Sequence, residues 1–548
     1  MEPIFTDKQL NNMGREDLIS LMKIVQEQTK KKDTEIQLLK DKQKELEFLN
    51  AMLSDRLTLA QRKQFGASSE KYAEGYEQMN LFNEAEANAD AETEELFEEI
   101  RPSSYKCKKR KGKKEEDLSN FETVATRTYK LEGEARYCPE CGKKYSVVTK
   151  ETVKRLRFIP AKFEVEEEIT YVYSCPECGS MKRPEKEPSL IRGSIATPSL
   201  VAGIMNAKYV NGMPLARQER EFARYDLDLS TKTMANWIIN CADRHLKPLY
   251  QLMKEELLES RYIHCDESRI QVLGEPDQKG TTQNWMWVYL TDEFSGSPQM
   301  VLFDYERTRA GYHPVNFLGD RFHGYLTCDG YQAYHSLGEG IIVSGCLTHA
   351  RRRFDAALTA LKKDFTKEQL KETIAYQAMS RIGILYKTEE MIHNKTPEEK
   401  YEERQKQSRP VMDALFEWLH TMEDSVDRSS LIGDAILYTL NQEAYLKRYL
   451  EDGHLSIDNN SAERALKNFA VGRRNWLFAK SVRGAGASAL VYSITETALL
   501  NHLKSYAYLT YILDELRKMG AFPKEEELKK LLPWSEDLPE YCRTKLKK

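Results

Sequence analysis

The sequence predicts a multidomain α+β protein, and three observations support this fold class. The chain has 548 residues, which at roughly 150 residues per domain corresponds to three or four domains. A heptad pattern near the N-terminus, two CxxC pairs and a series of strand-like segments between helical stretches indicate separate modules. The hydrophobic fraction of 41% is typical of a chain that folds around a core, which excludes wholesale disorder.

The overall charge is close to balanced. Lys and Arg number 82 against 86 Asp and Glu, so the formal net charge of -4 does not by itself indicate a nucleic-acid partner. No run of about eighteen apolar residues and no signal-peptide pattern is present. We therefore expect a cytoplasmic protein without a membrane partner.

Apolar residues near the N-terminus follow a seven-residue period. One register contains Leu18, Val25, Lys32, Leu39, Leu46 and Leu53, and the other contains Met22, Thr29, Ile36, Gln43, Asn50 and Leu57. We expect residues 1–72 to form a coiled-coil dimerisation helix in which Asn50 helps to fix the register. A single amphipathic helix that packs on its own protein is the alternative.

Two blocks of opposite charge follow. Residues 84–99 contain eight acids, and residues 106–114 contain seven bases. We interpret residues 73–127 as a solvated charged linker, whose basic block would also suit phosphate groups.

Two CxxC pairs come next, Cys138-Pro-Glu-Cys141 and Cys175-Pro-Glu-Cys178, each followed by glycine and separated by 33 residues. Two such pairs supply four thiolates in tetrahedral arrangement around one ion and leave no open position. We therefore expect residues 128–185 to form a ribbon around one structural Zn²⁺. Chance pairing of two CxxC motifs is the alternative.

Residues 186–255 have a helical pattern. Residues 214–224 and 230–239 read as two helices with a short break, and Ser230 is a plausible N-cap of the second. The pair is typical of a helix-turn-helix that binds DNA, but an ordinary αα-hairpin has the same pattern.

Five strand-like segments occur within about 85 residues, at 262–266, 285–290, 300–305, 325–329 and 341–346. Two of them end on an aspartate, Asp266 and Asp329. If these strands are neighbours, the two carboxylates meet at one rim of the sheet, where oxygen ligands suit divalent cations. Each aspartate taken alone is also typical of a turn or a cap.

A third acid lies far downstream, in a helix that begins near Asp458. Its apolar stripe contains Ala462, Leu466 and Phe469, and Glu463 lies on the shoulder of that stripe. Glu463 is therefore a candidate for an inward-facing acid. The alternative is a surface ion pair with Lys467.

The chain resembles the insertion-sequence-66 family of bacterial DDE transposases. The resemblance rests on motifs that occur in one order over some 470 positions: 62–70 (RKQFGASSE), 213–217 (MPLAR), 328–331 (CDGY), 346–352 (CLTHARR), 458–466 (DNNSAERAL), 472–478 (GRRNWLF), 493–497 (SITET) and 531–534 (LLPW). The whole set is specific, although each motif alone is weak.

This resemblance implies a ribonuclease-H-like α/β catalytic core, built from residues 256–350 and 455–500, with an all-helical insertion at 351–454 and a helical tail at 501–548. It places the catalytic, metal-binding triad on Asp266, Asp329 and Glu463. Three carboxylates that hold two Mg²⁺ or Mn²⁺ ions about 4 Å apart support both strand cleavage and strand transfer. Cys346 and His349 match a motif of such enzymes, but we interpret them as a core cysteine and a helix-start histidine rather than zinc ligands.

Bases and aromatic residues surround the Glu463 motif. The candidates for DNA contact are Arg464, Lys467, Arg473, Arg474, Trp476, Lys480 and Arg483. A basic amphipathic surface with Trp476 in the core is the alternative. The expected partners are double-stranded DNA of element ends and target, further copies of the chain and companion proteins of the same element, with the protein nucleoid-associated when bound.

Two other functions fit parts of this pattern. A zinc-dependent DNA-binding regulator with a decayed catalytic fold would keep every module and lose only the metal chemistry. A metal-dependent nuclease without strand transfer would keep the same acids.

Overall fold

The computed structural model describes residues 162–174, 176, 178, 181–182, 184–279, 282–338, 340–362, 365–520 and 522–545, and four isolated positions before them. The chain divides into two units, and Pro188–Thr544 belongs to one of them. The described part of the other unit contains two short antiparallel strands, β1 (Tyr173–Ser174) and β2 (Met181–Lys182). The expected coiled coil and charged linker lie outside the described residues.

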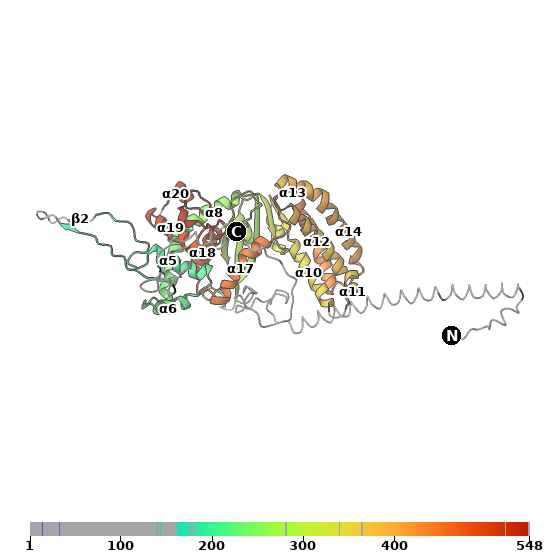
Figure 1. The fold of residues 1–548 in the computed structure, drawn as a ribbon, viewed down its shortest axis with the longest axis horizontal. Coiled ribbons are helices and arrows are strands. Elements are labelled where there is room, and N and C mark those ends of the chain that lie inside the picture. Colours follow the sequence, from blue (N-terminus) through green and yellow to red (C-terminus); the bar gives the residue numbers. More distant parts are fainter. Residues whose placement is uncertain are drawn as a thin grey trace. The chain divides into compact units, whose positions relative to one another are not determined.

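A five-stranded mixed sheet forms the centre of the larger unit (Figure 1). Its strands are β3 (Tyr262–Gln271), β4 (Gln283–Thr291), β5 (Met300–Glu306), β6 (Gly324–Cys328) and β7 (Ile341–Gly345). The order is β5-β4-β3-β6-β7; β4 is antiparallel to β3 and β5, whereas β6 is parallel to β3 and β7. The five strands expected from the sequence are therefore confirmed, but the first does not end at Asp266 as expected: β3 continues to Gln271, because its second half pairs with β4.

Gly324 fixes how β6 meets β3. A Cβ atom at this position would lie 2.2 Å from the carbonyl oxygen of Arg261, so only glycine allows the approach. The next residue, Tyr325, donates its backbone N–H to the same carbonyl at 2.8 Å. The parallel pairing that follows sets the end of β6 beside the middle of β3.

Helices precede the sheet in the chain. They are α5 (Pro198–Met205), the π-helical turn η3 (Asn206–Val210), α6 (Leu215–Ala223), α7 (Thr231–Cys241), the π-helical turn η4 (Ala242–Leu246) and α8 (Lys247–Glu259). Thr197 caps α5, and Ser230 caps α7 by accepting a hydrogen bond from the backbone N–H of Thr233 at 3.2 Å. The sequence-based assignment of Ser230 as an N-cap is confirmed.

A long helical segment separates β7 from the helix that carries Glu463. It contains α10 (Leu347–Leu361), α11 (Lys367–Glu372), α12 (Ile374–Ile392), α13 (Pro397–Glu403), η6 (Arg404–Ser408), α14 (Arg409–Glu423), α15 (Leu431–Asn441), α16 (Glu443–Leu446) and η7 (Arg448–Leu450). Thr366 and Thr396 begin α11 and α13 with capping boxes. This segment packs around a second apolar cluster that includes Phe354, Leu385 and Phe416 and extends to Tyr262 of β3 and Tyr325 of β6.

The remaining helices complete the larger unit. Short helices α9 (Tyr312–Leu318) and η5 (Gln332–Ser336) connect strands, and α17 (Asn460–Trp476), α18 (Val482–Leu500), α19 (Ser505–Lys518), α20 (Glu525–Lys529) and η8 (Glu540–Cys542) follow the helical segment. In Figure 1, α10, α12, α13 and α14 lie on one side of the sheet, and α5, α8, α18 and α19 lie on the other. None of the described helices is long and apolar enough to cross a membrane.

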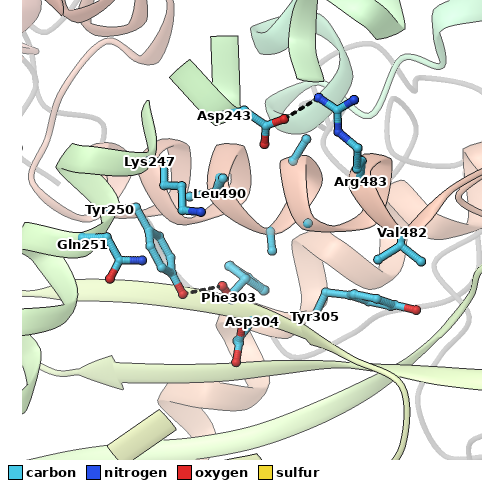
Figure 2. A pocket seen from close by; sticks show the side chains of 13 residues that line it. Asp243, Lys247, Tyr250, Gln251, Phe303, Asp304, Tyr305, Val482, Arg483 and Leu490 are labelled. Atoms are coloured by element: carbon cyan, nitrogen blue, oxygen red, sulfur yellow. Dashed lines mark hydrogen bonds and ion pairs between the residues drawn. The ribbon is translucent and has the colours of Figure 1, made fainter. Parts of the chain in front are cut away.

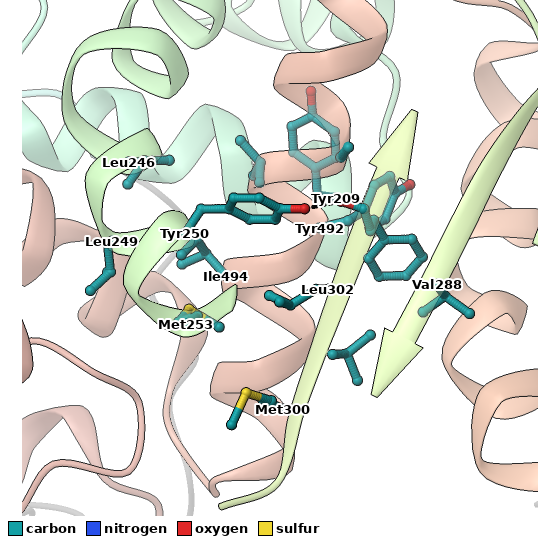
Figure 3. Packing of buried hydrophobic residues seen from close by; sticks show 14 of the residues in the cluster. Tyr209, Leu246, Leu249, Tyr250, Met253, Val288, Met300, Leu302, Tyr492 and Ile494 are labelled. Carbon is teal, nitrogen blue, oxygen red and sulfur yellow. Dashed lines mark hydrogen bonds between the residues drawn. The ribbon is translucent and has the colours of Figure 1, made fainter. Parts of the chain in front are cut away.

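The main core lies between the sheet and the helices α8 and α18. Tyr250 and Met253 of α8, Leu302 of β5 and Tyr492 and Ile494 of α18 are buried together (Figure 3). The rings of Tyr492 and Tyr209 meet edge to face with centroids 4.9 Å apart. This core holds α18 against the edge strand β5.

Two hydroxyl groups of α18 satisfy the backbone of the edge strand. Ser493 Oγ accepts the N–H of Phe303 at 2.8 Å, and Thr497 Oγ1 accepts the N–H of Val301 at 3.0 Å. Residues four apart on a helix lie on one face, so they can bond to alternate residues of one strand. The edge of the sheet at β5 is therefore covered rather than open to another strand.

Candidate active site

Asp266 and Asp329 lie at the same level of two adjacent strands, Asp266 in the middle of β3 and Asp329 directly after the end of β6. Strands β3 and β6 are parallel, with His264 opposite Thr327. Asp266 follows His264 by two residues, and Asp329 follows Thr327 by two, so the shared register brings both aspartates to equivalent places. The expectation that these two strands are neighbours is confirmed.

The start of α17 is tied to β3 just before Asp266. Asn459, which precedes α17, donates from Nδ2 to the carbonyl of Cys265 at 2.8 Å, and its Oδ1 lies 2.9 Å from His264 Nδ1. Its backbone N–H donates to Cys346 Sγ at 3.2 Å. These three bonds position the first turn of α17, where Glu463 lies, against the strand that carries Asp266.

The three acids act on one another electrostatically. Burial raises the pKa of Asp266 well above its ordinary value, and the charges of Glu267, Asp329 and Glu463 raise it further. The backbone N–H of Glu267 donates to Asp266 Oδ1 at 2.8 Å and opposes that shift. The structure therefore brings Asp266, Asp329 and Glu463 within electrostatic reach of one another, although they are scattered over the sequence.

Glu267 is a fourth acid beside these three, and the sequence analysis missed it; it is buried, whereas Asp266, Asp329 and Glu463 are half-buried. Arg309 contacts its Oε1 through Nε at 2.6 Å and Nη2 at 2.5 Å, and the hydroxyl of Tyr334 donates to Oε2. Burial and the charge of Asp329 raise the pKa of Glu267, while Arg309 lowers it. Because Arg309 and Tyr334 occupy its oxygens, Glu267 acts as the counter-ion of Arg309 here.

Helix α10 contributes two further charged groups. Arg352 contacts Glu463 with both guanidinium nitrogens, Nη1 to Oε1 at 2.9 Å and Nη2 to Oε2. His349, three residues earlier on the same face, has its Nε2 atom 3.9 Å from Glu463 Oε1. Glu463 is therefore paired with Arg352 rather than with Lys467, its expected surface alternative.

Cys346, His349 and Glu463 also come together as possible metal ligands, since their ligand atoms lie within 4.8 Å of one another. Two observations favour a structural role for Cys346. Burial raises the pKa of its thiol to about 12, and its sulfur accepts the N–H of Asn459. A protonated, hydrogen-bonded thiol is a poor ligand for zinc.

His264, which contacts Asn459, also forms a buried ion pair with Asp292. His264 Nε2 lies 3.1 Å from Asp292 Oδ2, and Ser456 Oγ donates to the same oxygen at 3.1 Å. Burial alone would lower the pKa of His264, but Asp292 and Asn459 outweigh it and the pKa is raised. Since Oδ1 of Asn459 is an acceptor, both ring nitrogens of His264 serve as donors, as in an imidazolium.

Asp266, Asp329 and Glu463 fit divalent cations. Carboxylate oxygens from two adjacent strands and one helix are the donors that Mg²⁺ and Mn²⁺ prefer. The raised pKa of Asp266 means that its negative form is disfavoured among its neighbours, so a cation would relieve a repulsion that the fold builds in. The donor set and the local charge therefore both suit such ions.

Gly330 shapes the wall beside Asp329. A Cβ atom at Gly330 would lie 2.5 Å from the hydroxyl of Tyr438, which belongs to α15. Arg353 of α10 stacks on the Tyr438 ring, 4.1 Å from its centroid, and pairs with Asp434 at 2.5 Å. The helical segment 347–450 thus supplies one wall of the site, which explains the glycine of the CDGY motif.

The expected DNA-contacting residues fall into two groups. Arg464, Lys467 and Arg474 are exposed on one face of α17, and Lys480 is exposed beyond its end. Three others have contacts within the protein: Arg473 donates to the carbonyl of Arg269, Trp476 packs on Phe469 with centroids 6.0 Å apart, and Arg483 pairs with Asp243 at 2.7 Å.

Arg483 lies at a cavity of about 330 Å³ between α8, β5 and α18 (Figure 2). Asp304 of β5 also lines this cavity, and burial raises its pKa to about 6. Asp266, Asp329 and Glu463 do not line this cavity, since strand β5 is two places from β3 in the sheet.

Of the four cysteines expected to bind zinc, the structure describes Cys178. It is exposed, and in sequence it lies between β1 and β2, which pair as an antiparallel hairpin. Cys138, Cys141 and Cys175 lie outside the described residues. The four-cysteine ligand set therefore stays a prediction.

Comparison with known protein families gives three matches in order along the chain. Residues 193–487 match a family described as "Transposase IS66 family". Residues 135–179 match "zinc-finger binding domain of transposase IS66", and residues 52–120 match "Transposase C of IS166 homeodomain". The chain therefore has a zinc-finger region before its mixed α/β core.

Two similar proteins come from Sinorhizobium fredii (strain NBRC 101917 / NGR234). "Uncharacterized protein y4hP" is 30% identical over 412 residues, which cover 72% of this chain and 73% of the relative. "Uncharacterized protein y4jD" is 29% identical over 418 residues, covering 74% and 79%. No solved structure matches the chain.

Proposed function

The chain belongs to the IS66 family of transposases, and from this premise we propose that it is a DDE transposase. It binds the ends of a bacterial insertion sequence, cleaves DNA strands to free 3′ hydroxyls and transfers these to target DNA. Asp266, Asp329 and Glu463 are its catalytic and metal-binding residues. The observation that carries this assignment is the meeting of β3, β6 and the start of α17, where burial and then the charges of Glu267, Asp329 and Glu463 raise the pKa of Asp266.

The fold supports the same assignment. Three antiparallel strands, β3, β4 and β5, are followed by β6 and β7, which are parallel to β3, in the order β5-β4-β3-β6-β7. We assign this core to the ribonuclease-H-like class, with the helical segment 351–454 as an insertion. In such an arrangement the strands that come first and fourth along the chain supply two acids, and a later helix supplies the third. Here these elements are β3, β6 and α17.

Mg²⁺ or Mn²⁺ held by these three acids would activate a water or a 3′ hydroxyl and stabilise the leaving oxygen at a phosphodiester. The protein's own residues prepare that site. Asn459 and His264 fix the start of α17, so Glu463 is held near the strand that carries Asp266. Arg309 neutralises Glu267, which limits the negative charge that an approaching phosphate meets.

The exposed face of α17 suits a DNA backbone. Arg464, Lys467 and Arg474 follow one another along the helix that begins at the acids. Contacts to phosphate position a duplex without reading its sequence. The exposed basic face of α17 therefore aligns DNA with Glu463, and other parts of the chain recognise the sequence.

Recognition of element ends is assigned to the upstream modules. The zinc-finger region carries Cys138, Cys141, Cys175 and Cys178, which we propose bind one structural Zn²⁺. Helices α6 and α7 form a second candidate for groove contact. We propose that residues 1–72 join two or more copies, because two ends must be held together, and that companion proteins of the same element take part.

The zinc assignment has its own test. Cys138→Ser should lower the zinc content and weaken end-specific binding relative to random DNA, because three thiolates no longer close the shell. Zinc content is measured by atomic absorption, and binding by fluorescence anisotropy. Unchanged zinc stoichiometry contradicts the four-cysteine site.

The activity is tested with the full-length protein, Mg²⁺ and duplexes from the DNA that flanks its gene. The expected products are nicks that leave 3′ hydroxyls and strands joined to a second duplex. Cleavage without joining would favour a nuclease. Binding without any cleavage would favour a DNA-binding regulator with a decayed catalytic fold, and both results would overturn the proposed function.

A further inference from the structure

The turn that follows α17 has an unusual backbone. Leu477 has φ 62° and ψ -50°, and the N–H of Phe478 donates to the carbonyl of Trp476 at 2.8 Å. These values define a γ-turn with positive φ at its centre, which is rare and strained for a residue that has a Cβ atom. Among the described residues, the other non-glycine positions with positive φ are Asp226, Asp277 and His502, so Leu477 alone among them is apolar.

The surrounding structure holds this turn in place. Before it, Asn475 Nδ2 donates to the carbonyl of Gly212 at 2.9 Å, and Arg473 donates to the carbonyl of Arg269. After it, Ala479 exchanges backbone hydrogen bonds with Gln271 and Leu273 at the end of β3, at 2.9 and 3.0 Å. With both flanks fixed, the strain at Leu477 persists in the fold.

The strain directs apolar side chains into solvent. Leu477 is 65% exposed and Phe478 is 43% exposed, although both are large hydrophobic residues. They lie at the end of the basic face formed by Arg464, Lys467 and Arg474, with Lys480 just beyond. Exposed apolar side chains beside arginine and lysine side chains suit insertion between the base pairs of a duplex, because the cationic groups can bind the phosphates at the same time.

We infer that Leu477 is a wedge that enters the base stack of duplex DNA bound along α17. This inference rests on the proposed function. Glu463 and Leu477 are fourteen residues apart, which at 1.5 Å per residue is about 21 Å along the helix axis. At 3.4 Å per base step, the opened step lies about six base pairs from the phosphate at the acids.

The experiment uses full-length protein and duplexes that carry 2-aminopurine at successive positions around the mapped cleavage site, with Ca²⁺ in place of Mg²⁺ to keep the strands intact. Unstacking raises the fluorescence of 2-aminopurine. The wild type should give an increase of several-fold at a position about six base pairs from the cut. In Leu477→Gly this increase should be lost, while the Kd for the duplex changes less than about threefold because phosphate contacts supply most of the affinity.

Glycine is the informative substitution because it adopts positive φ without strain. Leu477→Gly should therefore melt at the same temperature as the wild type or higher, so loss of the signal does not arise from misfolding. Leu477→Met should keep the signal, because it retains a long apolar side chain. Phe522→Ala, which removes a ring that is 94% exposed elsewhere, should also keep it.

Two results overturn the wedge alone: a wild type that cleaves this DNA without unstacking any base, and a Leu477→Gly variant that retains the full fluorescence increase. A wild type that neither binds nor cleaves the DNA overturns the proposed function together with the wedge.

Discussion

His264 Nδ1 donates a hydrogen bond to Asn459 Oδ1 across 2.9 Å in the buried interior, and this bond joins two segments 195 residues apart. His264 precedes Asp266 on β3, and Asn459 precedes the helix that carries Glu463. The position of one catalytic candidate relative to another therefore depends on a bond between residues that are not themselves candidates.

Asn459→Ala tests that dependence. The change removes the acceptor of His264 and the donor to Cys265, so we expect a loss of about 1–3 kcal/mol in the free energy of unfolding. Because α17 is no longer fixed at its start, DNA cleavage should fall about 100-fold, as small misplacements at active sites do. Asn501→Ala is the matched control, since its Nδ2 donates to the carbonyl of Gln299 at 2.8 Å away from the acids. Equal activity in the two variants would argue against a positioning role for Asn459.

Asp266→Asn should separate stability from activity. In the folded protein, burial and three neighbouring carboxylates disfavour the charged form of Asp266, so its pKa is raised and stability is lost as pH rises past the unfolded value. An amide removes that repulsion. We expect a higher melting temperature at pH 7.5, measured by scanning calorimetry without metal, together with undetectable cleavage. A variant that is both less stable and active would contradict the assignment.

Arg352→Gln should increase the affinity for Mg²⁺. The guanidinium of Arg352 contacts both oxygens of Glu463, and a cation must compete with it. Its loss should lower stability without metal by up to about 1 kcal/mol, because the pair is partly exposed. The measurement is the Mg²⁺ concentration at which the melting temperature rises. Arg353→Gln, which breaks a pair with Asp434, is the control that should leave this concentration unchanged. An unchanged or higher Mg²⁺ requirement in Arg352→Gln would count against competition.

Glu496 predicts a pH dependence of stability. It is 6% exposed, and burial raises its pKa from 4.5 to about 7, against the opposing bond from Asn468. The folded state therefore binds this proton more tightly than the unfolded state, so stability should fall as pH rises from about 4.5 to about 7 by roughly 3 kcal/mol. Glu496→Gln should remove this part of the decline in urea unfolding, whereas Glu526→Gln on the exposed face of α20 should not. An identical pH profile in wild type and Glu496→Gln would refute the shift.

Local pattern was sufficient for the presence of the strands and for the cap at Ser230, because strand period and capping preference are written in short stretches of sequence. The candidate acids were found only from the order of several motifs along the chain. Arg352 and Glu267 could not be found in this way. Arg352 and Glu463 are 111 residues apart in the chain, and Glu267 and its partner Arg309 are 42 residues apart, so neither ion pair is visible in a short stretch of sequence. Trp476 is half-buried and packs against the core residue Phe469, so its predicted contact with DNA stays a prediction.

The central claim is that Asp266, Asp329 and Glu463 hold divalent metal ions together. Anomalous diffraction from crystals of the full-length protein with Mn²⁺ and cleaved DNA tests it most directly. The account predicts two manganese peaks, each contacted by carboxylate oxygens of this trio and absent in crystals of Asp329→Asn. Peaks centred on Cys346 and His349, or the three carboxylates apart with no metal between them, would contradict it.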